Sequence, residues 1–267
     1  MTGGPARPDT IARRVNAERI VVLGWPRAIL LQFAHPLVAA GVADHSAFRR
    51  GPFTAVMRLH YTIRAMLALG FGGEQERSTA LEGIRTIHRR VNGSLRETTG
   101  IFPTGTRYSA EDPDLVLWVH ATLLETIPLV YELLVRPLTA AERDTYVEDT
   151  APVAIDLGAR RGEVPRTWNE SLAYLRRTYA SGVIAVGADA RELAPRVLSP
   201  LGGVAAPFGW MNRLLTVGLL PDNIRAMYGY DWSERHDRRF RRLVATMRAG
   251  RRITPAPLAL WPEARRV

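Results

Sequence analysis

The stretch that decides the fold is Asp112–Val135, which reads DPDLVLWVHATLLETIPLVYELLV. Asp112 is a favourable N-cap residue, and Pro113 follows at the first helical position, where its missing N–H is not needed. The residues after them form the most apolar helical stretch of the chain. We therefore expect one long helix that ends near Val135 and is kinked at Pro128.

Helical patterns continue on both sides of this segment. Thr139-x-x-Glu142 and Thr167-x-x-Glu170 match the capping box, so a helix should begin at each. The other predicted helices are Arg27–Ala43, Val56–Leu69, Ser78–Asn92, Ala188–Leu198, Phe208–Gly218, Pro221–Tyr228 and Ser233–Ala249. Extended alternating runs are scarce, which predicts an all-α single domain of about eight to eleven helices.

We divide the 267 residues into three parts. Residues 1–20 form an N-terminal arm, and residues 21–232 form the helical domain. Residues 233–267 form a basic C-terminal helix and tail that pack on it. The glycine- and proline-rich stretch Ser199–Gly209 is the best candidate for a hinge or an ordered loop.

Two residue types are absent from the composition. The sequence has no cysteine and no lysine, so arginine supplies all 36 basic residues against 26 acids, a formal charge of +10. Without cysteine there are no disulfides, thiolate nucleophiles or cysteine-held metal centres. Without lysine there is no Schiff base and no phosphate-loop lysine. Any metal or haem ligand must come from the six histidines, the carboxylates or tyrosine.

The sequence predicts neither a secretory signal nor a membrane span. The N-terminus has no apolar core. Ile20–Ala43 is rich in apolar residues, but it contains Pro26, Arg27 and Pro36, which make a bilayer span unfavourable. We expect a buried core helix there, and its Arg27 and His35 side chains then need hydrogen-bond or ion-pair partners. We also expect the protein to be cytoplasmic.

The segment Arg235–Arg252 holds eight arginines and one acid. Phe240, Leu243, Val244 and Met247 follow the spacing of one helix face. This pattern predicts an amphipathic helix that packs by its apolar stripe, with solvated arginines opposite. The alternatives are contact with an anionic membrane surface or with nucleic acid. No nucleic-acid motif accompanies the arginines, so we expect no nucleic-acid partner.

The polar residues in apolar surroundings are the candidates for a site. His88 and His120 lie in apolar helical stretches, where a histidine is more often a hydrogen-bonded core residue than a ligand. Arg58 and Thr62 share a helix face, and Tyr61 lies beside it. These three either surround a ligand in an apolar cavity or are structural. In the structural case Arg58 pairs with a core acid, for which the candidates are Asp44, Glu82 and Asp112.

Several short motifs, taken together in this order, resemble one family over about Val22–Tyr230. The motifs are Ala34–Ser46 (AHPLVAAGVADHS), Arg58–Thr62 (RLHYT), Ile87–Gly93 (IHRRVNG), Tyr108–Pro113 (YSAEDP), Trp118–Thr122 (WVHAT) and Leu138–Tyr146 (LTAAERDTY). The family is the haem-b oxygenase superfamily that includes rubber oxygenase (latex-clearing protein) and the mycophenolic acid pathway oxygenase. The chain is similar to its short bacterial branch.

The resemblance implies an all-helical fold around one b-type haem, with dioxygen as co-substrate and an apolar small molecule as substrate. His88 matches the helix histidine that is the proximal iron ligand, and His120 is the main competitor for that role. His35 and His45 are further candidates for cofactor contacts. His45 and Asp44 also lie near the expected position of a catalytic base.

On the distal side, Arg58 and Thr62 match an arginine and a threonine of rubber oxygenase. Tyr61 stands where rubber oxygenase has a distal lysine. The resemblance implies that Arg58 stabilises a haem propionate or negative charge on oxygen, and that Tyr61 and Thr62 orient the distal ligand. Trp118 and Phe33 either line the pocket or belong to the core.

The sequence thus favours a haem-b-dependent oxygenase. Two other classes stay open. The chain could carry haem as a sensor, carrier or electron-transfer protein, which a second iron ligand from His120, His35 or Tyr61 would favour. Alternatively, it could bind no haem and act as a helical binding protein at a membrane surface through Arg235–Arg252.

Overall fold

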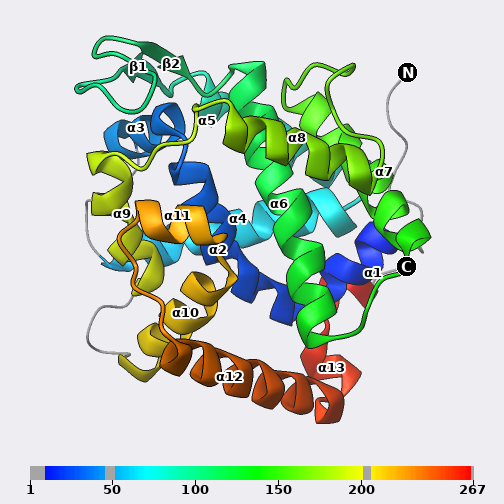
Figure 1. Cartoon of the computed structure of the whole chain (residues 1–267). Coiled ribbons are helices and arrows are strands. Elements are labelled where there is room, and N and C mark those ends of the chain that lie inside the picture. Colours follow the sequence, from blue (N-terminus) through cyan, green and yellow to red (C-terminus); the bar gives the residue numbers. More distant parts are fainter. Residues whose placement is uncertain (1–9, 46–51, 201–205, 266–267) are drawn as a thin grey trace.

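The computed structural model describes residues 10–45, 52–200 and 206–265, and the side chains of residues 52–59 and 206 lie outside that description. Within these ranges the chain folds into thirteen α-helices and one two-stranded hairpin (Figure 1). This confirms the predicted all-α single domain, with more helices than the eight to eleven expected. The elements are α1 (Ile11–Ala17), α2 (Trp25–Phe33), α3 (Pro36–His45), α4 (Pro52–Phe71), α5 (Glu74–His88), α6 (Pro113–Leu134), α7 (Ala140–Asp156), α8 (Trp168–Ala180), α9 (Ala188–Leu198), α10 (Ala206–Leu219), α11 (Asp222–Met227), α12 (Glu234–Ile253) and α13 (Ala256–Ala259), with the 3-10 helices η1 (Arg19–Gly24) and η4 (Pro262–Arg265) and the strands β1 (Asn92–Ser94) and β2 (Arg107–Ser109).

Helix α6 occupies the centre of the molecule, as its apolar sequence indicates (Figure 1). The Asp112 carboxylate caps it by accepting a hydrogen bond of 2.9 Å from the Asp114 N–H, and Pro128 lies inside the helix. Its length and composition would suit a membrane span, but 67% of its most apolar window is buried by the rest of the protein. Helix α6 is therefore the central core helix of the domain.

The predicted helix Arg27–Ala43 is two helices, which corrects that prediction. α2 ends at Phe33 and α3 begins at Pro36, and the two segments meet at an angle of 107°. Pro36 has no N–H to continue the hydrogen bonds of α2, and proline disfavours helical backbone at the preceding residue, His35. The bend places α3 across the end of α2, where it packs on α9.

Arg27 and the N-terminal segment are both integrated in this core. The Arg27 side chain is 2% exposed and has the partners that its burial requires. Residues 11–20, predicted as part of an arm, form α1 and the start of η1, and α1 packs against α7. The predicted hinge Ser199–Gly209 lies partly outside the described residues, and α10 begins at Ala206 within it.

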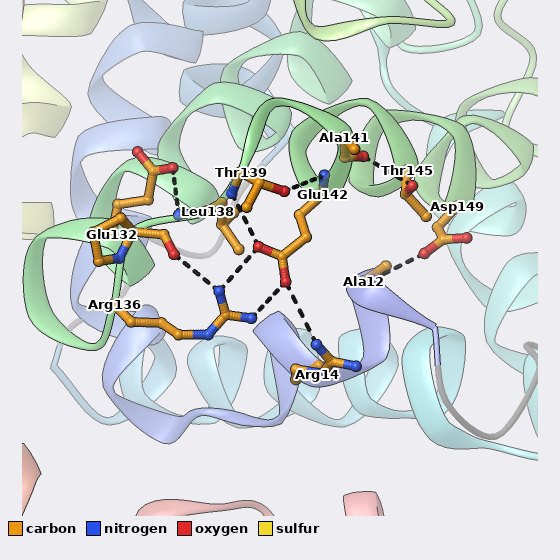
Figure 2. Close-up of polar contacts among 11 residues, drawn as sticks. Ala12, Arg14, Glu132, Arg136, Leu138, Thr139, Ala141, Glu142, Thr145 and Asp149 are labelled. Atoms are coloured by element: carbon orange, nitrogen blue, oxygen red, sulfur yellow. Dashed lines mark hydrogen bonds and ion pairs between the residues drawn. The ribbon is translucent and has the colours of Figure 1, made fainter.

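Helix α7 begins at the predicted capping box (Figure 2). The Thr139 hydroxyl accepts a hydrogen bond of 3.1 Å from the Glu142 N–H, and the Glu142 carboxylate accepts one of 3.0 Å from the Thr139 N–H. Arg136 donates to the same carboxylate, and Arg14 of α1 lies 3.5 Å from it. These hydrogen bonds lower the pKa of Glu142 to about 2. The charged cluster therefore joins α7 to α1.

The predicted box at Thr167 is only half formed. The Thr167 hydroxyl caps α8 by accepting a hydrogen bond of 3.2 Å from the Glu170 N–H. The Glu170 carboxylate accepts instead from the N–H of Arg166, one residue before the cap, at 2.7 Å.

The sequence does not reveal the hairpin of β1 and β2, in which Gly93 faces Tyr108. Each strand has three residues, too few to show an alternating pattern.

Helix α12 lies along one edge of the molecule and packs on α10 and α6 (Figure 1). Phe240, Leu243, Val244 and Met247, its predicted apolar stripe, are half-buried. No residue of α12 is fully buried. The helix is thus attached to the domain by one partly covered side.

Candidate functional site

A cavity of about 1060 Å³ lies between α6 and the helices α1, α3, α4, α5 and α7. Its volume lies just above the usual range for small-molecule pockets, roughly 300–1,000 Å³. Most of the residues that line it are apolar. A cavity of this size and character fits a large, mainly apolar ligand.

Helix α6 forms the floor of the cavity. The residues that line it from this helix are Leu115, Val116, Val119, His120, Leu123, Leu124 and Ile127. They recur every three or four residues and cover about 18 Å along the helix axis at 1.5 Å per residue. Trp118 and Ala121, on another side of the helix, are buried in the core. α6 therefore separates the cavity from the main core.

Helices α4 and α5 form a wall of the cavity and pack against each other. Ile63, Met66 and Leu67 of α4 and Ile84 of α5 face the space inside. Among their described side chains, only Leu69 and Leu81 are fully buried. The apolar side chains of this wall therefore face the cavity instead of packing against other helices.

His120 lies near the middle of the floor. Its Nε2 atom is buried and has no hydrogen-bond partner. Burial lowers the pKa of His120 to about 4, so the imidazole is neutral at physiological pH. A buried imidazole nitrogen without a partner is unfavourable unless a ligand binds it, and neutral imidazole is a good ligand for haem iron.

His88 lines the same cavity from the last residue of α5. Burial lowers its pKa, against an opposing effect of the Glu111 carboxylate, and the ring is therefore also neutral at physiological pH. The structure thus brings together the two histidines that the sequence offers as iron ligands, and both are in the protonation state that ligation requires.

His45, the last residue of α3, is the third histidine of the cavity. Its Nε2 donates a hydrogen bond of 2.9 Å to the carbonyl oxygen of Asn92 at the start of β1. This bond holds the ring against the hairpin. The neighbouring Asp44 accepts a hydrogen bond of 2.6 Å from the buried Tyr108 hydroxyl and forms an ion pair with Arg96.

His35 is placed elsewhere. It is buried at the bend between α2 and α3, its ring lies 5.4 Å from that of Phe102, and its Nδ1 has no partner. Burial lowers its pKa to about 4. It does not line the large cavity. Trp118 and Phe33, the two aromatic residues with alternative interpretations, both belong to the core.

The three predicted distal residues lie on α4. Arg58 is in the helix, and its side chain is outside the described residues. Tyr61 is 64% exposed and Thr62 is also exposed, and neither lines the cavity. The structure therefore does not bring Tyr61 and Thr62 to His88 and His120. Of the acids considered as partners of Arg58, Asp44 pairs with Arg96, Glu82 pairs with Arg89, and Asp112 caps α6.

Trp25, the first residue of α2, is a cavity residue that the sequence did not indicate. Its indole N–H is buried without a partner. A tryptophan before a proline carries no motif, and its place opposite α6 depends on packing between distant helices. The cavity thus contains an unpartnered N–H donor as well as the free nitrogen of His120.

The end of the cavity between α1 and α7 is more polar. Asn16, Glu148 and Asp149 line it. The Asp149 carboxylate accepts a hydrogen bond of 3.0 Å from the Ala12 N–H near the start of α1 (Figure 2). Together with the Glu142 cluster, this contact positions the two helices that close this end.

In the described part of the chain, no group of three or more histidines and carboxylates is arranged to hold a metal ion. Haem does not need such a group, since the protein supplies one or two axial ligands to its iron. The cavity, its neutral imidazoles and the free nitrogen of His120 fit this requirement.

Comparison with known proteins places the chain among oxygenases. It is 28% identical over 234 residues to the uncharacterized proteins Mb2261 of Mycobacterium bovis and Rv2237 of Mycobacterium tuberculosis, covering 85% of this chain and 87% of each relative. No solved structure matches it significantly. The profile of the family described as "ER-bound oxygenase mpaB/B'/Rubber oxygenase, catalytic domain" matches residues 12–249. The chain therefore belongs to this family of oxygenase catalytic domains.

Proposed function

We propose that the protein is a haem-b-dependent oxygenase that uses dioxygen on an apolar small molecule. The observation that carries this proposal is the large apolar cavity in which His88 and His120 are both neutral and the Nε2 of His120 has no partner. When bound, haem supplies the iron chemistry that activates dioxygen. Membership of an oxygenase family supports the same reaction class.

His88 is the proposed iron ligand. It matches the proximal histidine by resemblance, and it faces the cavity from the end of α5. His120 is then left to act on dioxygen or on the substrate, because its neutral ring can donate or accept one hydrogen bond at Nε2. The indole N–H of Trp25 is a second donor on the cavity wall.

Arg58 and Thr62 keep a proposed role at the edge of the haem. They lie at spacings of four residues from Met66 and Gly70, which line the cavity from the same helix. Met66 and Gly70 of this row line the cavity, while Thr62 is exposed outside it, so the proposed contact from Arg58 to a propionate rests on the resemblance. Tyr61 lies off the row and is 64% exposed, so we leave it out of the proposed site.

The apolar lining supports an apolar substrate. Leu123, Leu124 and Ile127 continue the cavity beyond His120 toward α1 and α7. Substrate in this part would lie on apolar side chains, with Asn16 and Asp149 at its far end. Burial of its apolar surface would supply most of the binding free energy.

The experiment is haem loading of purified full-length variants from haem-supplied cells. The variants are His88→Ala, His120→Ala and, as control, His60→Ala, whose side chain is exposed on α4. We expect a Soret band and carbon monoxide binding after reduction in the wild type and the control. His88→Ala should lose haem. His120→Ala should keep haem and react more slowly with dioxygen.

Other results would contradict parts of the proposal. Absence of a Soret band after haem titration would exclude every haem function. Loss of haem in His120→Ala with retention in His88→Ala would exchange the two roles. Since both imidazoles lie in one cavity, a haem protein for sensing or electron transfer is the second candidate. A six-coordinate spectrum that does not respond to carbon monoxide would favour it over an oxygenase.

A further inference from the structure

The outer side of α12 is a basic surface that the proposed oxygenase function does not use. Two acids within the helix neutralise part of its charge, since Glu234 pairs with Arg238 and Asp237 pairs with Arg241. Glu18 pairs with Arg251 at the other end. Four exposed arginines of α12 have no ion-pair partner among the described residues: Arg235, Arg239, Arg242 and Arg252.

Three of these arginines, Arg235, Arg239 and Arg242, belong to a continuous exposed stripe. Its members, at alternating spacings of four and three residues, are Arg235, Arg239, Arg242, Thr246, Ala249 and Ile253. This spacing places them on one side of the helix. The stripe is cationic in the first half of α12 and changes to small and apolar residues in the second half. We call it the outer stripe.

The outer stripe ends at an exposed apolar tip. Ile253 is 84% exposed, and Leu258 on α13 is 65% exposed. Arg252 and Arg265 flank this tip in the sequence, and Arg265 donates to the carbonyl of Pro257. Two large aliphatic side chains between arginines suit the boundary between lipid headgroups and acyl chains.

The packed side of α12 is also incompletely covered. A groove of about 420 Å³ runs beside the helix, with Leu133, Phe240 and Val244 among its apolar residues. Arg248 lines the same groove, and its Nε atom is buried without a hydrogen-bond partner. An anionic lipid headgroup would give Arg248 a partner, and the acyl chain of that lipid would cover the apolar residues of the groove.

We propose that α12 and α13 dock on an anionic lipid bilayer. Arg235, Arg239 and Arg242 contact the headgroup phosphates, and Ile253 and Leu258 enter the acyl boundary. Arginine near an anionic membrane surface is attracted by its potential. Nucleic acid would satisfy the arginines but would leave the aliphatic tip exposed. This docking does not require haem, so it stands independently of the proposed oxygenase function.

The test is co-sedimentation of the full chain with vesicles of phosphatidylcholine, with and without phosphatidylglycerol. The stripe variant is Arg235→Glu, Arg239→Glu, Arg242→Glu, and the tip variant is Ile253→Ser, Leu258→Ser. Matched controls use residues far from α12 that are exposed. The charge control is Arg161→Glu, Arg166→Glu, Arg176→Glu, and the apolar control is Ile101→Ser. Circular dichroism and thermal melts verify that each variant is folded.

We expect the wild type to bind only the anionic vesicles and to be released by salt. The stripe variant should bind at least tenfold more weakly, and the tip variant should also lose affinity, while both controls keep it. If the stripe variant and the charge control lose the same amount of vesicle affinity, net charge alone explains binding and the proposal is overturned. Wild-type binding by the tip variant would overturn insertion of the tip. Absence of binding, or tighter stripe-dependent binding to DNA or RNA at the same salt, would overturn docking on a bilayer.

Discussion

At the scale of single residues, Arg27 shows how a charged side chain is kept in the core. It is 2% exposed, and its Nε donates a hydrogen bond of 2.7 Å to the carbonyl of Leu219. Its Nη1 donates to the Thr126 hydroxyl at 2.5 Å and lies 2.8 Å from a carboxylate oxygen of Glu125. Arg27 thereby links α2 to α6 and α10.

Removing one partner of this buried pair should be more harmful than removing both. We expect Arg27→Ala to lower the free energy of unfolding by about 3–5 kcal/mol, because Glu125 would keep its charge without a partner. The double variant Arg27→Met, Glu125→Leu should lose much less. Urea denaturation monitored by circular dichroism measures both. A double variant that is as unstable as Arg27→Ala would contradict this explanation.

Part of the site is recognisable from single residues of the sequence. Arg27 and His35 were expected to need partners, and Arg27 has them, whereas the Nδ1 of His35 does not. His88 is the iron ligand expected from the sequence and His120 its competitor, and both line the cavity. Trp25 could not be found, because no local pattern marks a side chain that reaches the site through packing between distant helices.

At the scale of elements, the contact between α10 and α12 depends on Gly218. A Cβ atom at this position would lie 2.8 Å from Cη2 of Trp232 and would also overlap the Phe240 ring. The glycine therefore lets the first apolar residue of the α12 stripe approach the backbone of α10. The attachment of the basic helix to the domain rests on this close approach.

Gly218→Ala should push α12 away from α10. Overpacking costs roughly 1–3 kcal/mol, and alanine returns up to about 1 kcal/mol of helix propensity, so we expect a net loss of stability. Gly250→Ala is the control within α12, since a Cβ there meets nothing within 4 Å, and it should be neutral or stabilising. Thermal unfolding compares the two. A Gly218→Ala protein as stable as the control would show that α12 adjusts freely.

Element boundaries were predictable where capping residues mark them and less so elsewhere. Asp112, Thr139 and Thr167 each begin a helix as expected. The region Arg27–Ala43 has helical periodicity throughout, and only Pro36 signals the bend. The hairpin of β1 and β2 is held by pairing with a partner thirteen or more residues away, which a local pattern does not reveal.

At the scale of the whole molecule, buried histidines should make stability depend on pH. Burial lowers the pKa of His35 and of His120 to about 4, from an ordinary value near 6.5. Between these two values the unfolded chain binds protons that the folded chain does not bind. The free energy of unfolding should therefore fall as pH decreases from about 6.5 to about 4, by up to about 1.4 kcal/mol per pH unit for each histidine.

Urea denaturation at about pH 7 and about pH 5 tests this dependence in the haem-free protein. Replacing His35 by Asn should reduce the loss of stability between the two conditions, because one of the buried histidines that take up protons on unfolding is gone. His60→Asn, at an exposed position on α4, is the control and should leave the difference as it is. An unchanged difference in His35→Asn would mean that His35 does not contribute.

The wall formed by α4 and α5 would couple the stability of this protein to a ligand bound in the cavity. Of their described side chains, only Leu69 and Leu81 are buried, and Leu69 itself lines the cavity together with Ile63, Met66 and Leu67. A molecule that fills the cavity completes their packing and binds the folded chain alone. At a free concentration one hundred times its dissociation constant, it adds about 2.7 kcal/mol to the stability. In a cell, copies that have captured their ligand would outlast empty copies, so the abundance of the protein would follow the availability of what it binds.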